Sequence, residues 1–79
     1  MEGRYANYAQ VGYNAAEFVL DFGQLHPPTD TPHFHIRIIT TPVYAKAFLE
    51  TLLVSLQRYE EEYGEIADRL HHDNRMSDG

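Results

Sequence analysis

The N-terminal half of the chain contains three short segments in which apolar and polar residues alternate. They cover residues 4–11, 17–22 and 34–40. Alternation with a period of two is typical of a strand that buries one face. The first segment is only weakly apolar, the second has an acidic opposite face, and the third is rich in β-branched residues, which favour strands. The sequence therefore predicts three consecutive strands.

Residues that favour turns separate these strands. We expect Gly12 to form a bulge or bend and Asn14 to be able to take a left-handed conformation. Residues 25–32 contain three prolines and no periodicity, so they form a loop. The alternation places three apolar side chains on one side of the third strand: Phe34, Ile36 and Ile38.

A long helix follows the third strand. Thr41 is a good N-cap, and Pro42 suits the first helical position because its missing N–H costs nothing there. We expect the helix to end near Tyr63, with Gly64 as its C-terminal cap. Another short helical turn is expected over residues 65–70, before a polar tail.

The apolar positions of this helix are spaced alternately by four and three residues, as in a heptad seam. Phe48 and Leu53 widen this stripe beyond a seam. The residues of the seam are Ala45, Leu49, Leu52, Leu56, Tyr59 and Tyr63.

The pattern predicts an α+β fold, with a three-stranded antiparallel meander and one long C-terminal helix packed on it. We expect a single domain over residues 1–79, with an ordered core at about 4–66 and a polar tail at 67–79. A chain of 79 residues buries little core alone, and without cysteine it cannot add disulfides or thiolate zinc sites. We therefore expect a homo-oligomer, a dimer or a tetramer, that completes the fold. The residues expected at its interface are Leu49, Leu52, Leu56 and Tyr59.

The net charge of −6 argues against nucleic acid as a partner, because binding phosphates requires clustered Lys and Arg. Lys46 and the scattered arginines form no patch in the sequence. The N-terminus does not have the pattern of a signal peptide, and the longest apolar region is interrupted by polar residues, so we expect a cytoplasmic protein with no membrane partner.

Histidine is the one enriched residue type that commonly forms sites. His33 and His35 are two positions apart on a predicted strand, so their side chains can share a face and bind zinc, nickel or copper. Three further residues are candidates to complete such a set: Glu17, His26 and Asp30. The alternative is that both histidines face solvent beside a buried Phe34.

No catalytic motif is visible in the sequence. There is no Ser-His-Asp arrangement, no glycine-rich phosphate loop and no nucleophile elbow, so we expect neither enzymatic activity nor a cofactor. Glu17 and Asp21 share a strand face, but the sequence offers no pocket for acid–base chemistry there, and a solvated face is the simpler interpretation. Tyrosines are favoured at interfaces, so we expect contacts with an unknown protein partner at Tyr5, Tyr8 and Tyr13.

Several stretches of the chain resemble the bacterial domain-of-unknown-function family 3467 (DUF3467). They are Gly3–Tyr8, Gly12–Phe22 and Arg37–Lys46, which leads into the helix that closes at Gly64. The resemblance covers about residues 3–66. The family has no established activity, so the resemblance implies no catalytic residues.

The order of the predicted elements also looks like a reduced version of the export chaperone SecB. This likeness is one of topology, which is a weak guide to function. The leading hypothesis is a non-enzymatic, homo-oligomeric protein-interaction module of a chaperone-like or adaptor-like kind. The alternative is a metal-binding or small-molecule-binding protein that uses His33 and His35.

Overall fold

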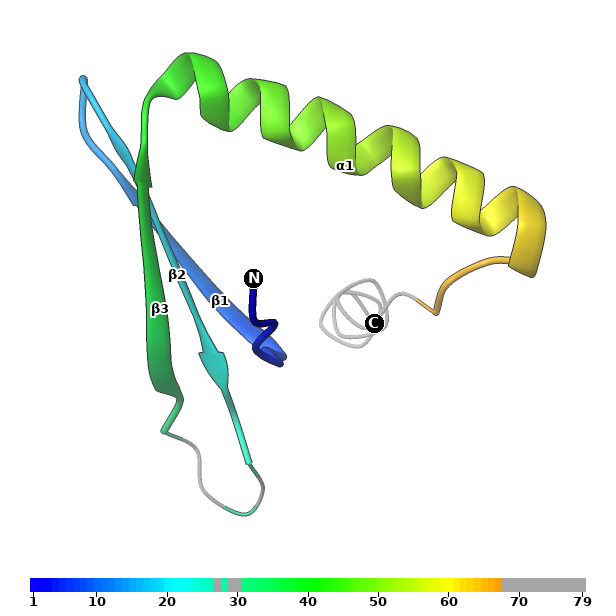
Figure 1. Cartoon of the computed structure of the whole chain (residues 1–79), viewed down its shortest axis with the longest axis horizontal. Coiled ribbons are helices and arrows are strands. Elements are labelled where there is room, and N and C mark those ends of the chain that lie inside the picture. Colours follow the sequence, from blue (N-terminus) through cyan, green and yellow to red (C-terminus); the bar gives the residue numbers. More distant parts are fainter. Residues whose placement is uncertain (27, 29–30, 68–79) are drawn as a thin grey trace, which may run out of the picture. The chain divides into compact units, whose positions relative to one another are not determined.

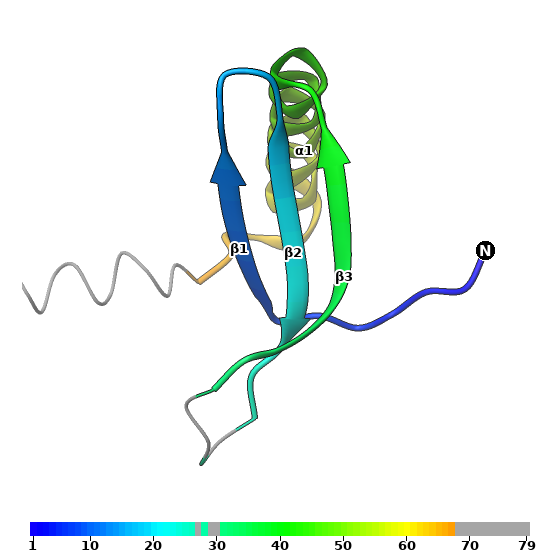
Figure 2. The same cartoon turned by 90° about the vertical axis from the view of Figure 1, so that its left-hand side faces the viewer.

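Three strands and one helix follow one another in the predicted order (Figure 1). The computed structural model describes residues 1–26, 28 and 31–67. The elements are β1 (Tyr8–Tyr13), β2 (Phe18–Gln24), β3 (His33–Thr40) and α1 (Pro42–Tyr63). The strands form one antiparallel sheet in the order β1-β2-β3, which confirms the predicted meander (Figure 2).

The structure divides into two units, Met1–Phe48 and Leu49–Gly79. The first holds the sheet and the first two turns of α1, and the second holds the rest of the helix. The predicted packing of the helix on the sheet stays a prediction, as does the single domain. Residues 68–70 of the expected second helical turn, and nearly all of the expected tail, lie outside the described residues.

A hairpin turn of residues 14–17 joins β1 to β2. The N–H of Asn14 donates to the carbonyl of Glu17 at 3.0 Å, and the side-chain oxygen of Asn14 accepts from the N–H of Ala16 and of Glu17 at 2.8 and 2.9 Å. No described residue other than glycine has a positive φ, so Asn14 stabilises the turn with its side chain, as Asn often does.

Two predictions about the first strand are wrong. β1 begins at Tyr8 and continues to Tyr13, whereas alternation alone placed the strand at residues 4–11. Gly12 forms no bulge, because it pairs with Val19 in an uninterrupted register. The position of the Asn14 turn, which local alternation does not reveal, sets this register.

The bulge lies instead on β3. Phe22 pairs with Ile36 and Gly23 pairs with Phe34, which leaves His35 as an extra residue between them. Because side chains alternate along a strand, one extra residue moves Phe34 to the opposite face from Ile36. The prediction that Phe34, Ile36 and Ile38 share one side of β3 is therefore wrong for Phe34.

The cross-strand pairing gives the sheet two unlike faces, because directly paired residues point to the same side. The face that we call the apolar face carries Ala9, Val11, Tyr13, Phe18, Leu20, Phe22, Ile36 and Ile38. The opposite face carries the ion pair of Asp21 and Arg37, and the rings of Tyr8 and Phe34 meet there at a centroid distance of 5.8 Å.

The helix has the ends that the sequence predicts. The N–H of Tyr44 donates to the side-chain oxygen of Thr41 at 3.2 Å, which is the N-cap bond. At the other end Gly64 has a φ of 98° and its N–H donates to the carbonyl of Glu60 at 3.0 Å. This is the left-handed cap that glycine adopts readily.

No apolar side chain is buried among the described residues, and the sole residue there in the buried class is Gly23. The strands of the apolar face are half-buried or exposed, and no residue of α1 is buried. The described part of a single chain therefore contains the secondary structure of an α+β domain without a closed hydrophobic core.

Candidate interaction surface

An open apolar groove of about 400 Å³ lies within the first unit. Its floor comes from β2 and β3, and its wall comes from the first two turns of α1. The lining residues are Leu20, Phe22, Ile38, Thr40, Tyr44 and Phe48. Thr40 is the one residue in this set that is not hydrophobic, so the groove is suited to apolar side chains and offers almost no polar group to fix a small ligand.

The helical stripe predicted for self-association is exposed. The fractions exposed are 61% for Leu49, 42% for Leu52, 41% for Leu56 and 50% for Tyr59. Tyr59 also contacts Tyr63 one turn further on, at a ring distance of 5.0 Å. These residues are therefore available to a partner, and their role in self-association stays a prediction.

The three tyrosines predicted to contact a partner do not form one cluster. Tyr13 stacks on Phe18 on the apolar face at a ring distance of 5.6 Å. Tyr8 lies on the opposite face beside Phe34, and Tyr5 precedes β1. Each of the three is exposed, but no single flat partner surface reaches both faces of a sheet.

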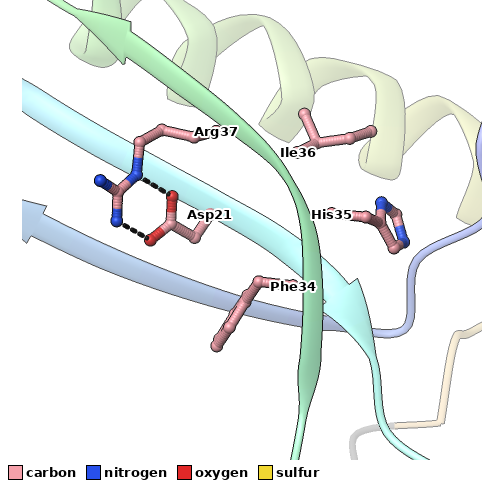
Figure 3. Close-up of a pocket in the computed structure, with 5 residues that line it drawn as sticks. All are labelled: Asp21, Phe34, His35, Ile36 and Arg37. Atoms are coloured by element: carbon pink, nitrogen blue, oxygen red, sulfur yellow. Dashed lines mark hydrogen bonds and ion pairs between the residues drawn. The ribbon is translucent and has the colours of Figure 1, made fainter.

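The histidines lie at the start of β3. His33 is exposed and pairs with Gln24, and His35 is the half-buried extra residue of the bulge. The Nδ1 atom of His35 is buried and has no hydrogen-bond partner within the described residues. Figure 3 shows His35 and Ile36 on one side of β3 and Phe34 and Arg37 on the other.

No group of three or more potential metal ligands is found among the described residues. Asp30, which we considered as a ligand, lies outside the described residues, as do His71 and His72. A tetrahedral structural zinc site needs four ligands. No observation in the described part of the chain therefore favours the metal-binding alternative.

Asp21 and Arg37 form a bidentate ion pair across β2 and β3 (Figure 3), with N–O distances of 2.8 and 2.9 Å. The hydrogen bond from Arg37 lowers the pKa of the Asp21 carboxyl below its usual value. The pair lines an open hollow of about 320 Å³ on β3, together with Phe34, His35 and Ile36. The sequence alone groups Asp21 with Glu17 and does not indicate Arg37, because the cross-strand register is needed to bring opposite charges face to face.

A search for membrane spans finds no helix in the described residues that is both long and apolar enough to cross a bilayer.

The model of one protein family matches residues 1–68, and its description is "Protein of unknown function (DUF3467)". No curated protein and no solved structure matches the chain. The likeness in topology to the export chaperone SecB therefore stays a prediction.

Proposed function

The chain belongs to the DUF3467 family of proteins of unknown function, and from this premise we propose that it is a non-enzymatic, homo-oligomeric protein-interaction module. In this proposal a second copy covers the helical stripe of Leu49, Leu52, Leu56 and Tyr59. The completed assembly then binds another protein in a chaperone-like or adaptor-like role.

The observation that carries the proposal is that no apolar side chain is buried among the described residues. Burying one large aliphatic or aromatic side chain stabilises a fold by about 1.5–3 kcal/mol, and this term offsets the entropy lost on folding. A chain that leaves its leucines and tyrosines in water gains little of this stabilisation from burial. Contact with another protein surface supplies the missing burial.

The length of α1 supports self-association independently. Its 22 residues span about 33 Å, at 1.5 Å per residue. The longest strand, β3, has 8 residues and spans about 26 Å. The helix is thus about one turn longer than the longest strand, and in our proposal its surplus last turn, with Tyr63, contacts a second copy.

The breadth of the helical stripe supports the same conclusion. Phe48 and Leu53 flank the seam, and both are 50% exposed. A stripe of this width exceeds a two-helix seam, so it has area for contact with two surfaces. In our proposal one is the protein's own sheet and the other is a second copy.

Contact with a separate partner protein is the second part of the proposal. Tyr8 and Tyr13 display exposed rings on opposite faces of an edge strand, and Tyr5 precedes that strand. Tyrosine combines apolar area with a hydrogen-bonding group, and it is enriched in interfaces. The chain's net charge of −6 favours a partner with a basic surface.

Light scattering coupled to gel filtration tests the oligomer. At micromolar concentration we expect a mass of two or four times 9.1 kDa. Leu56→Glu should weaken the assembly at least ten-fold, because it places a charge in the stripe. The matched control is Gln57→Glu, which adds the same charge at the next position, outside the apolar stripe, and should leave the mass unchanged. A wild-type monomer at this concentration would refute the proposal.

A further inference from the structure

The outer edge of β1 differs from the outer edge of β3. The sequence of β1 is YAQVGY, with no charged residue and no proline, and it pairs with β2 without a register shift. β3 carries Arg37 and the bulge at His35. Soluble proteins protect exposed strand edges with charges, prolines and bulges. Of the sheet's two edges, β3 has such protection and β1 has none.

The hairpin bond shows which residues of β1 present their backbone to this edge. Asn14 donates its N–H to the carbonyl of Glu17, so these two form a hydrogen-bonded pair. Hydrogen-bonded and non-hydrogen-bonded pairs alternate along an antiparallel ladder. The backbone groups of Gln10 and Gly12 therefore point toward β2. The residues whose N–H and C=O point outward are Ala9, Val11 and Tyr13.

We propose that β1 of a second copy adds to this edge in antiparallel orientation, with Val11 of one copy opposite Val11 of the other. This register pairs Ala9 of each copy with Tyr13 of the other, so all three outward-pointing residues find partners. Each such pair exchanges two N–H···O bonds. The two three-stranded sheets become one continuous sheet with a two-fold axis beside Val11. The inference rests on the proposed homo-oligomer and names one of its interfaces.

The side chains of β1 support the proposal that the strand added to its outer edge comes from a second copy. Ala9, Val11 and Tyr13 all lie on the apolar face, and residues paired across an antiparallel ladder point to the same side. The pairing therefore joins the apolar faces of both copies into one larger apolar surface. A two-fold axis requires that the same surface of each copy is complementary to itself. The outer edge of β1 meets this requirement when the register is centred on Val11.

The charge distribution also supports pairing between the β1 strands of two copies. Each copy carries a net charge of −6, so two copies repel each other in general. An uncharged strand is the part of the sheet where two such copies can approach closely. The edge of β3 is less suitable, because the bulge interrupts its ladder and Arg37 lies on it.

A single-cysteine experiment tests the register, since the natural chain has no cysteine. Opposed residues of a hydrogen-bonded pair have Cα atoms about 5.5 Å apart, within the range of about 4.4–6.8 Å that a disulfide spans. The full-length variant Val11→Cys should form a covalent dimer under mild oxidation at micromolar concentration. The matched control is Ile39→Cys on the other edge, which should crosslink at least ten-fold more slowly.

Amide hydrogen exchange provides a second test of the edge pairing. It uses the natural sequence, so no substitution can affect the result. A free edge predicts fast exchange at Val11 and slow exchange at Gln10. The proposed pairing predicts that the Val11 amide is protected to within about ten-fold of Gln10, since both are then hydrogen-bonded.

The outcomes separate the two proposals. A wild-type oligomer whose Val11 amide exchanges fast, or whose Val11→Cys variant does not crosslink, overturns the edge pairing and leaves the oligomer intact. Equal crosslinking by Ile39→Cys overturns the choice of edge. A wild-type monomer overturns both proposals.

Discussion

Gly23 is the residue on which the geometry of the sheet depends most directly. It pairs with Tyr8 on one side and with Phe34 on the other, next to the extra residue of β3. A Cβ at this position would collide with the backbone carbonyl of His33 and lie 2.8 Å from the Cα of Phe34. β2 and β3 approach closely there, and the rings of Tyr8 and Phe34, the two residues that pair with Gly23, contact each other.

Gly23→Ala is therefore expected to destabilise the fold. The new methyl group meets backbone atoms that cannot rotate away, and overpacking of this kind costs about 1–3 kcal/mol. Urea denaturation followed by circular dichroism measures the loss. Gly12→Ala is the matched control, because a Cβ on Gly12 meets nothing within 4 Å. Equal stabilities of the two variants would contradict the steric argument.

The ion pair of Asp21 and Arg37 predicts a pH dependence. Because the hydrogen bond from Arg37 lowers the folded-state pKa of Asp21, the unfolded chain binds the proton more tightly. The stabilisation is fully present above the unfolded pKa of about 3.9, and it is lost as the pH falls through the folded pKa. Asp21→Asn should be less stable than wild type at pH 6, and the difference should shrink below about pH 4. Denaturation curves at both pH values measure this, and a difference that does not change with pH would contradict it.

At the scale of elements, the helix could be predicted closely and the strands only in part. Thr41, Pro42 and Gly64 act on the backbone within one helical turn, so their effect can be predicted from neighbouring residues alone. The start of β1 and the bulge at His35 depend on which strand residues pair across the sheet. Alternation in one strand carries no information about that register.

The candidate surfaces likewise include some that could be predicted from the sequence and some that could not. The stripe of α1 could be predicted because a helix fixes the spacing of its own side chains. The pairing of Asp21 with Arg37 and the apolar groove on β2 and β3 could not, because each combines residues from separate elements. The three tyrosines were grouped by residue type, and the structure distributes them over both faces of β1 and the segment before it.

Thr41→Ala tests the junction between β3 and α1. It removes the oxygen that accepts the N–H of Tyr44, and the loss of such an N-cap costs about 1 kcal/mol. The free energy of unfolding, measured in urea, should fall by about this amount. Thr41→Ser keeps the hydroxyl and should retain most of the stability. If the serine variant lost as much as the alanine variant, the cap would not be the cause.

At the scale of the whole molecule, folding and association are expected to form one equilibrium. The described residues bury no apolar side chain within one chain, so in the proposed oligomer most of the hydrophobic stabilisation comes from contacts between chains. Obligate homodimers often have no stable folded monomer, and we expect this of the proposed assembly.

The melting temperature should accordingly depend on protein concentration. A 100-fold increase in concentration adds about 2.7 kcal/mol, which corresponds to a rise in Tm of about 5–10 °C for a dimer of this size. Thermal melts between about 1 and 100 μM, followed by far-ultraviolet circular dichroism, measure the shift. A Tm that stays constant over this range would indicate a chain that folds on its own.

The extra residue at His35 has a consequence for how far such a sheet can grow. If β1 strands join across a two-fold axis, the β3 strands become the two outer borders of the joined sheet. There the bulge breaks the ladder and Arg37 adds charge, so a third chain finds no regular template. The bulge at His35 would thus limit growth of the joined sheet, and we expect a chain without this residue to have a more regular outer ladder that adds further strands more readily.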